Sequence, residues 1–147
     1  MILVDANLLL YAYQPRSAHH EGSRRWLESV LSSPELVRFA WVTLWAFIRI
    51  STNPRVFEQP LVVSEAEGIV SSWLEQPNAG ILEPGERHWQ ILCSLMSDGQ
   101  TSAALVMDAA LAAIALEHGA TLYSTDRDFA RFTGLIVVNP LVAARRP

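Results

Sequence analysis

Residues 101–116 carry a single ionisable side chain, Asp108, among alanines, leucines and other apolar residues. This pattern predicts a helix over residues 103–118 that ends at Gly119, because glycine readily takes the left-handed conformation at a helix C-terminus. A helix that is apolar on every side has to be buried. A strand over residues 121–124 follows directly, so the sequence predicts a buried helix that turns back along a strand, as in α/β domains.

Short apolar runs alternate with amphipathic segments along the rest of the chain. The alternation predicts strands over residues 2–4, 36–41, 121–124 and 135–138, and helices over residues 8–13, 17–32, 42–51, 64–75, 85–96 and 103–118. Ser64 is expected to cap its helix, with Glu67 completing a capping box. The chain shows no repeat and no linker, so we predict one α/β domain over residues 1–147, with a small parallel sheet flanked by helices.

The composition limits where the protein works. No apolar run approaches the roughly 18 residues that a membrane helix needs, and the first residues lack the features of a signal peptide. We therefore expect a cytoplasmic, unprocessed protein with no membrane partner. Cys93 is the only cysteine, which excludes an internal disulfide and a cysteine-based zinc site.

The basic residues limit the chemistry further. All eleven are arginines, so the chain has neither a phosphate-loop lysine nor a Schiff base. The dehalogenase-type phosphatases and the receiver domains also begin with a strand that ends in Asp, but both need a lysine. The net charge of −4 argues against a broad basic face for duplex DNA, yet it is compatible with RNA bound by a local cluster of arginines.

Two aspartates occupy unusual positions. One lies between a predicted strand and a predicted helix, and the other lies within an apolar helix. Asp5 ends the strand of residues 2–4, and it is either a helix N-cap or part of a site. Asp108 lies within the apolar helix, and a lone buried carboxylate costs several kcal/mol unless it is paired, hydrogen-bonded or metal-bound. A buried arginine partner and a protonated acid are the alternatives for Asp108.

Two further aspartates follow the strand of residues 121–124. Asp126 lies at the carboxyl end of that strand, where α/β proteins place their ligands, although a role in a turn is the alternative. Asp128 either caps a short helix over residues 129–132 or joins the same site.

The predicted topology brings three of these carboxylates together. The helix that contains Asp108 runs antiparallel to the strand before Asp126, so both residues lie at one sheet edge, and Asp5 joins them if the first strand is parallel. Carboxylates about 5 Å apart repel by roughly 3 kcal/mol per pair at an effective dielectric constant of about 20. The cluster therefore needs protons or a cation. Oxygen ligands suit Mg²⁺ or Mn²⁺, ions that support phosphodiester hydrolysis.

Three segments of the chain resemble the motifs of PIN domains, in the same order and spacing. They are ILVDAN at residues 2–7, DAALAA at residues 108–113 and STDRDF at residues 124–129. The length, the segment RISTNPRVF at residues 49–57 and the ending Asn139-Pro140 are similar to those of the VapC toxins of actinobacteria.

The resemblance implies a three-layer fold with a four- or five-stranded parallel sheet. It also implies the toxin of a type II toxin–antitoxin system, an endoribonuclease that uses Mg²⁺ or Mn²⁺ to cut tRNA, rRNA or mRNA. A homodimer is implied, as is a VapB-type antitoxin whose C-terminal segment blocks the active site.

The resemblance assigns roles to individual residues by motif match. Asp5, Asp108 and Asp126 would hold the metal, and these three with Asp128 would form the catalytic set. Thr125 would support the metal site together with Asp128, and Asn7 would position Asp5. The arginines expected to contact the RNA backbone are Arg49, Arg127 and Arg131.

One position departs from the family pattern. Most PIN domains carry a glutamate on the helix after the second strand, and this position aligns with Ala46 in TLWAFIR, residues 43–49. The loss favours a one-metal mechanism. It also supports a second hypothesis, a catalytically weak or inactive PIN-fold module that binds RNA or protein. Arg49 is either a phosphate contact or a surface residue.

Aromatic and histidine side chains give weaker signals. Trp41, Trp45 and Phe47 are candidates for stacking on bases, but their spacing is more typical of a core. The four histidines show no ligand spacing and are expected at the surface or at helix ends.

Overall fold

A five-stranded parallel sheet forms the centre of the computed structural model, which describes residues 1–142. The strands follow the order β3-β2-β1-β4-β5 across the sheet. Their bounds are β1 (Ile2–Val4), β2 (Val37–Phe39), β3 (Ala79–Ile81), β4 (Thr121–Tyr123) and β5 (Val137–Val138). β1 is the middle strand, and Ile2 is in register with Val37 on one side and with Thr121 on the other.

Six α-helices and two 3₁₀ turns complete the part of the chain that the structure describes. The α-helices are α1 (Ala6–Ala12), α2 (His20–Leu31), α3 (Trp41–Ser51), α4 (Val63–Leu74), α5 (His88–Asp98) and α6 (Val106–His118). The 3₁₀ turns are η1 (Ala103–Leu105) and η2 (Arg127–Arg131). None of the described helices is both long and apolar enough to cross a membrane.

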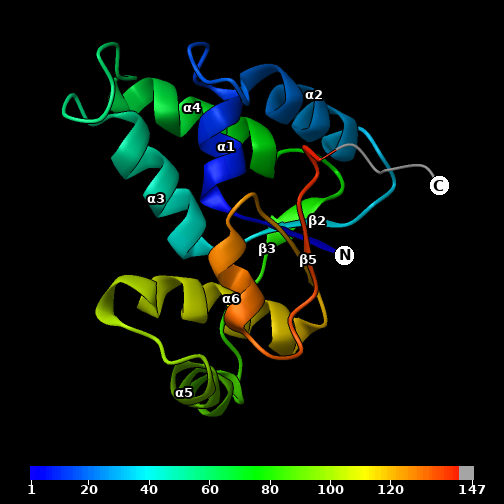
Figure 1. Ribbon diagram of the computed structural model, residues 1–147. Coiled ribbons are helices and arrows are strands. Elements are labelled where there is room, and N and C mark those ends of the chain that lie inside the picture. The colour runs from blue at the N-terminus through cyan, green and yellow to red at the C-terminus, as the bar shows by residue number, and fades with distance from the viewer. Residues whose placement is uncertain (143–147) are drawn as a thin grey trace.

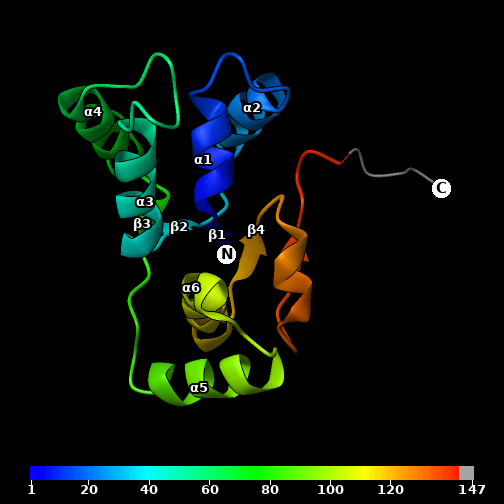
Figure 2. The same ribbon diagram turned by 60° about the vertical axis from the view of Figure 1, so that its left-hand side comes forward.

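The helices form layers on both sides of the sheet. α1 to α4 lie on one side and α5 with α6 on the other (Figures 1 and 2). Alternate side chains of β1 serve the two layers, as expected for a pleated strand. Ile2 and Val4 pack with α1 to α4, whereas Leu3 packs with α5 and α6. The prediction of an α/β, three-layer fold with a small parallel sheet is therefore confirmed.

The buried helix behaves as its composition predicts. Of the seven consecutive residues 109–115 of α6, six are buried and Ala110 is half-buried, and Gly119 ends the helix with φ of +65°. The chain then enters β4, which runs antiparallel to α6. This helix–strand unit places the N-terminal turn of α6 near the carboxyl edge of the sheet.

Two sequence predictions about helix starts are wrong. Helix α4 begins at Val63, with Val62 at the N-cap, and Glu65 accepts a hydrogen bond of 3.2 Å from the Val62 backbone N–H. Ser64 therefore lies inside the first turn and caps nothing. Helix α5 begins at His88 instead of residue 85, because Glu117 accepts backbone hydrogen bonds from Gly85 and Arg87 and holds the preceding segment against α6.

The sequence analysis missed strand β3 and overestimated two other strands. β2 covers only residues 37–39 of the predicted 36–41, because Ala40 is the N-cap of α3, and β5 covers only 137–138 of the predicted 135–138. The last residues of the predicted domain, 143–147, lie outside the described part of the chain.

Candidate active site

The carboxyl ends of β1 and β4 lie side by side and carry the central residues of the site. Asp5 follows β1, and its backbone N–H donates to the Tyr123 carbonyl at the end of β4. Its Oδ1 accepts a hydrogen bond of 2.7 Å from the Ala6 backbone N–H, which makes it the N-cap of α1. The N-cap interpretation of Asp5 is therefore confirmed, and the same side chain stands at the predicted sheet edge.

Ser124 connects the side chains at this edge. Its hydroxyl donates a hydrogen bond of 2.6 Å to Asp5 Oδ2 and accepts one of 3.0 Å from the Asp126 backbone N–H. The Asn7 side-chain amide also donates a hydrogen bond of 3.3 Å to the Ser124 hydroxyl oxygen. Ser124 is almost completely buried, so it holds Asp5 in one orientation away from bulk water.

The sequence analysis did not single out Ser124. Asn7 was expected to position Asp5, and its hydrogen bond goes to Ser124, which in turn donates to Asp5. The expected supporting role of Thr125 stays a prediction. The available signal was a small hydroxyl residue directly after a buried strand. Asn7 Oδ1 is a further oxygen of interest, because it is buried and has no hydrogen-bond partner in the part of the chain that the structure describes.

The pKa of Asp5 depends on its burial and on the charged and polar groups around it. Its pKa is raised from 3.8 to about 6, chiefly by burial and to a smaller extent by the negative charges of Asp108 and Asp126. The hydrogen bonds from Ser124 and Ala6 act in the opposite direction, because they stabilise the ionised carboxylate. The mutual repulsion indicates that the sheet edge brings Asp5, Asp108 and Asp126 into one electrostatic neighbourhood.

Asp108 reaches the same neighbourhood from the first turn of α6. It is half-buried, and burial raises its pKa, as do the charges of Asp126 and Asp128, while Arg131 lowers it. Within residues 1–142 no arginine forms an ion pair with Asp108. The alternative of a buried arginine partner is therefore wrong, and a raised pKa keeps the protonated acid open.

Asp126 and Asp128 divide their roles differently from the prediction. Asp126 is the N-cap of η2, and its Oδ1 accepts a hydrogen bond of 2.8 Å from the Asp128 backbone N–H. Capping of a helix over residues 129–132 was one of the two alternatives for Asp128, beside membership of the carboxylate site. The capping alternative is wrong, because η2 starts earlier. The exposed Asp128 side chain instead lies 3.6 Å from the Arg131 guanidinium.

A hollow of about 290 Å³ opens beside these carboxylates. Helix α3 forms one wall and the beginning of α6 forms the other, with Asp5 and Ala6 between them. The complete lining is Asp5, Ala6, Val42, Thr43, Trp45, Ala46, Arg49, Met107, Asp108 and Leu111. The hollow therefore offers both carboxylates and one guanidinium to a ligand.

Comparison with known proteins agrees with the fold and the order of the motifs. The family model described as the PIN domain matches residues 2–135. This chain belongs to the PIN-domain family. Ribonuclease VapC37 of Mycobacterium tuberculosis is 46% identical over 135 residues, which cover 92% of this chain and 94% of the relative. Ribonuclease VapC43 of the same species is 40% identical over 141 residues, which cover 96% of each chain.

Solved structures support the same family assignment at the level of the fold. VapBC2 from Rickettsia felis, crystallised with a promoter DNA fragment, gives a TM-score of 0.69 at 16% identity, over 95% of this chain and 98% of that one. VapC20 from M. tuberculosis, described as a toxin that cleaves the sarcin–ricin loop, gives 0.66 at 17% identity, over 92% and 97%. The resemblance to VapC-type PIN domains is therefore confirmed.

The hollow contains the position where this PIN domain departs from its family. Ala46 lines the same space as Asp5 and Asp108. That the family's glutamate aligns with Ala46 stays a prediction. A glutamate there would point a fourth carboxylate toward the site. Arg49, one helical turn further along α3, lines the hollow as well.

The donor set at this edge suits a hard divalent cation. All of its candidate ligands are oxygens, one of them the unpartnered Asn7 Oδ1. The pKa of Asp5 is raised mainly by burial, with a smaller contribution from the charges of Asp108 and Asp126 that a cation would offset. No group of three or more His, Cys, Asp or Glu side chains within residues 1–142 is arranged as a ready-made metal site. Mg²⁺ commonly binds through one or two carboxylates together with water and phosphate oxygens, so the chemistry fits without such a cage.

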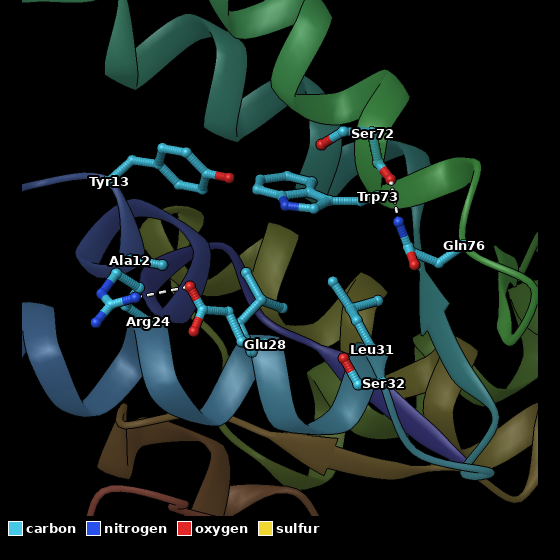
Figure 3. A pocket seen from close by; sticks show the side chains of 10 residues that line it. Ala12, Tyr13, Arg24, Glu28, Leu31, Ser32, Ser72, Trp73 and Gln76 are labelled. Carbon is cyan, nitrogen blue, oxygen red and sulfur yellow. Dashed lines mark hydrogen bonds and ion pairs between the residues drawn. The ribbon is translucent and has the colours of Figure 1, made fainter.

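A second hollow, of about 380 Å³, lies between α2 and α4 on the other side of α1 and contains none of the predicted site residues. Figure 3 shows Tyr13 and Trp73 on its upper side and the Arg24–Glu28 ion pair below them. These two charges neutralise each other, so this larger hollow has no unbalanced group to carry out chemistry.

The aromatic residues of α3 differ from the sequence prediction. Phe47 is buried as expected, but Trp41 is 39% exposed and Trp45 is 62% exposed. The core assignment of the two tryptophans is therefore wrong, since both are exposed and Trp45 lines the hollow beside Asp5. None of the four histidines lines the hollow beside Asp5.

Proposed function

We propose that this PIN domain is an endoribonuclease that acts as the toxin of a type II toxin–antitoxin pair and depends on Mg²⁺ or Mn²⁺. One observation carries the proposal: a buried carboxylate, Asp5, feels the charges of Asp108 and Asp126 at the edge of an open hollow. The names of its relatives as VapC ribonucleases support the reaction.

The proposed metal ligands are Asp5, Asp108 and Asp126. A divalent cation bound there would supply a water of lowered pKa and neutralise charge that develops on the phosphate. Two hydrogen bonds orient Asp5 for this role. The Ser124 hydroxyl donates to one carboxylate oxygen, and the Ala6 backbone N–H donates to the other. With a pKa of about 6, Asp5 is mainly ionised at neutral pH and able to bind a cation.

Arginines would hold the RNA backbone near the reacting phosphate. Arg49 lines the hollow, and neither Arg49 nor Arg127 forms an ion pair within the described residues. Arg131 is held by Asp128 and by the Gly99 carbonyl, so these contacts orient η2, and Arg131 would have to exchange some of them to bind an RNA phosphate. Asp128 thereby supports the site from its rim.

The proposal includes two protein partners. Several of the solved neighbours are toxin–antitoxin complexes, which supports a VapB-type antitoxin whose C-terminal segment blocks the hollow. A homodimer would cover some of the large exposed apolar side chains. An RNA substrate and an antitoxin both place the chain in the cytoplasm.

The test is cleavage of total cellular RNA by the purified full-length protein, freed from antitoxin, with Mg²⁺, with Mn²⁺ and with EDTA. The Asp108→Asn variant is the matched control, because it removes one charge at nearly constant volume. Discrete cuts that require the metal and disappear in the variant would support the proposal. Equal cutting by the variant, or full activity in EDTA, would refute the proposed site.

A second candidate function is a PIN-fold module that binds RNA or protein without cutting. It is favoured by Ala46, which leaves the hollow without the family's glutamate, and by the missing ready-made metal site among residues 1–142. RNA that is bound but left intact under every metal, by a folded protein, would select this function.

A further inference from the structure

Two exposed tryptophans form a stacked pair on the face of α3. The rings of Trp41 and Trp45 lie 6.4 Å apart with an angle of 20° between their planes. They are one turn apart on the helix, and Arg49 follows after another turn on the same face. Large aromatic side chains normally gain stability by burial, so a pair left in water indicates a surface that binds something.

The pair is held rigidly. The indole N–H of Trp41 donates a hydrogen bond of 3.1 Å to Glu83 Oε1, which fixes the outer ring between α3 and the segment after β3. The Trp41 ring lies nearly parallel to that of Trp45, with 6.4 Å between their centres. Trp45 therefore offers a flat aromatic surface that needs little ordering when a ligand binds.

Trp45 belongs to the same hollow as the carboxylates. It lines this space together with Asp5, Asp108 and Arg49. A ligand seated there meets an aromatic ring, a guanidinium with no ion-pair partner among the described residues, and the proposed cleavage site. A nucleotide matches all three, because it combines a flat base, an anionic phosphate and the bond to be cut. An apolar protein surface would leave Arg49 and Asp108 without partners.

We propose that Trp45 is a stacking platform for an unpaired base of the RNA, and that Arg49 contacts a phosphate beside that base. The substrate is then single-stranded RNA or a loop, because the base faces inside an RNA duplex are covered by their neighbours. This inference rests on the proposed function and adds Trp45 as a residue that positions the substrate through an unpaired base.

Binding is tested with full-length protein in the Asp108→Asn background, which prevents cutting. The probes are a fluorescent single-stranded RNA of about 12 nucleotides and its blunt-ended duplex. Trp45→Ala should weaken binding of the single strand by about 5- to 150-fold, the range expected for the loss of one base–aromatic stack. Trp45→Phe should recover part of the affinity, and the weaker binding of the duplex should not respond to Trp45→Ala.

Trp89→Ala is the matched control. Trp89 is 71% exposed on α5 and lies outside the lining of the hollow, so its removal deletes an equally large aromatic surface elsewhere. Its single-strand affinity should equal that of the parent. If Trp45→Ala and Trp89→Ala bind alike, the stacking inference is wrong.

The outcomes separate this inference from the proposed function. RNA cutting by otherwise wild-type protein that is insensitive to Trp45→Ala refutes the platform and leaves the ribonuclease intact. A chain that neither binds nor cuts any RNA refutes both. If light scattering shows that Trp45→Ala halves the molecular mass while single-strand affinity per chain is unchanged, the tryptophans form an interface between copies and the inference fails.

Discussion

The Ser124 hydroxyl donates a hydrogen bond of 2.6 Å to Asp5 Oδ2 across 119 positions of sequence. It ties the end of β4 to the end of the central strand β1. Because Ser124 also receives N–H groups from Asn7 and Asp126, one buried hydroxyl sets the relative positions of three polar residues.

Replacing Ser124 by alanine should impair catalysis through Asp5. The hydrogen bond lowers the Asp5 pKa, so its loss should raise that pKa above about 6. We expect RNA cleavage at neutral pH to fall roughly 10- to 100-fold, as is typical when a group that orients a metal ligand is lost. The acidic limb of the pH–rate profile should move to higher pH. Ser23→Ala is the control, because Ser23 is equally buried but its hydroxyl has no partner in the described chain. An unshifted profile in Ser124→Ala would contradict this role.

The free energy of unfolding should fall as pH rises through the titration of Asp5. The Asp5 pKa is about 6 in the folded protein and 3.8 at its ordinary value, so between these values the folded state binds more protons than the unfolded state. Without added metal, Asp5→Asn should be more stable than wild type above about pH 6, by up to about 3 kcal/mol, and equally stable below about pH 4. Urea unfolding across this pH range measures the difference. A wild type that gains stability relative to the variant as pH rises would reverse the predicted sign.

Divalent cations should stabilise the folded protein through the same carboxylates. At a free Mn²⁺ concentration of about 100 times Kd, the free energy of unfolding should rise by about 2.7 kcal/mol. Thermal unfolding with and without Mn²⁺ gives the shift, which should be mostly lost in Asp5→Asn. Asp98→Asn makes the same charge change on exposed α5 and should keep the full shift. An equal response in both variants would place the ion elsewhere.

Restoring an acid at position 46 should strengthen metal binding and weaken the metal-free fold. Ala46 lines the hollow with Asp5 and Asp108, so Ala46→Glu adds a ligand and also like-charge repulsion. We expect tighter Mn²⁺ binding by calorimetry, faster RNA cleavage and a lower melting temperature in EDTA. Ala46→Gln fills the same space without the charge and should show none of the gain in affinity. Equal affinities for the two variants would mean that position 46 does not face the ion.

The sequence was sufficient for features that depend on local pattern. Asp108 could be predicted as a site residue because a carboxylate in an otherwise apolar helix is costly unless it has a partner. Gly119 marked the end of that helix. The parallel sheet then placed Asp5 and Asp126 at one edge, as the structure shows. Their role as metal ligands remains a prediction.

Other features depend on contacts that no local pattern contains. β3 was missed because Ala79-Gly80-Ile81 is short and lacks a strand-like run. Its glycine is needed by a residue far away, since a Cβ on Gly80 would lie 3.3 Å from the Arg38 guanidinium. The exposure of Trp45 was also hidden, because the spacing of aromatic residues on α3 is the same for a core face and a binding face.

The position of β1 in the middle of the sheet has a consequence for synthesis. β1 is made before both of its neighbours, β2 on one side and β4 on the other, and the residues of β4 are made more than a hundred positions later. Because such distant pairing has to await β4, Asp5 lacks Ser124 and its acidic neighbours until that strand has left the ribosome. The candidate site therefore cannot assemble on a nascent chain that has not yet reached β4.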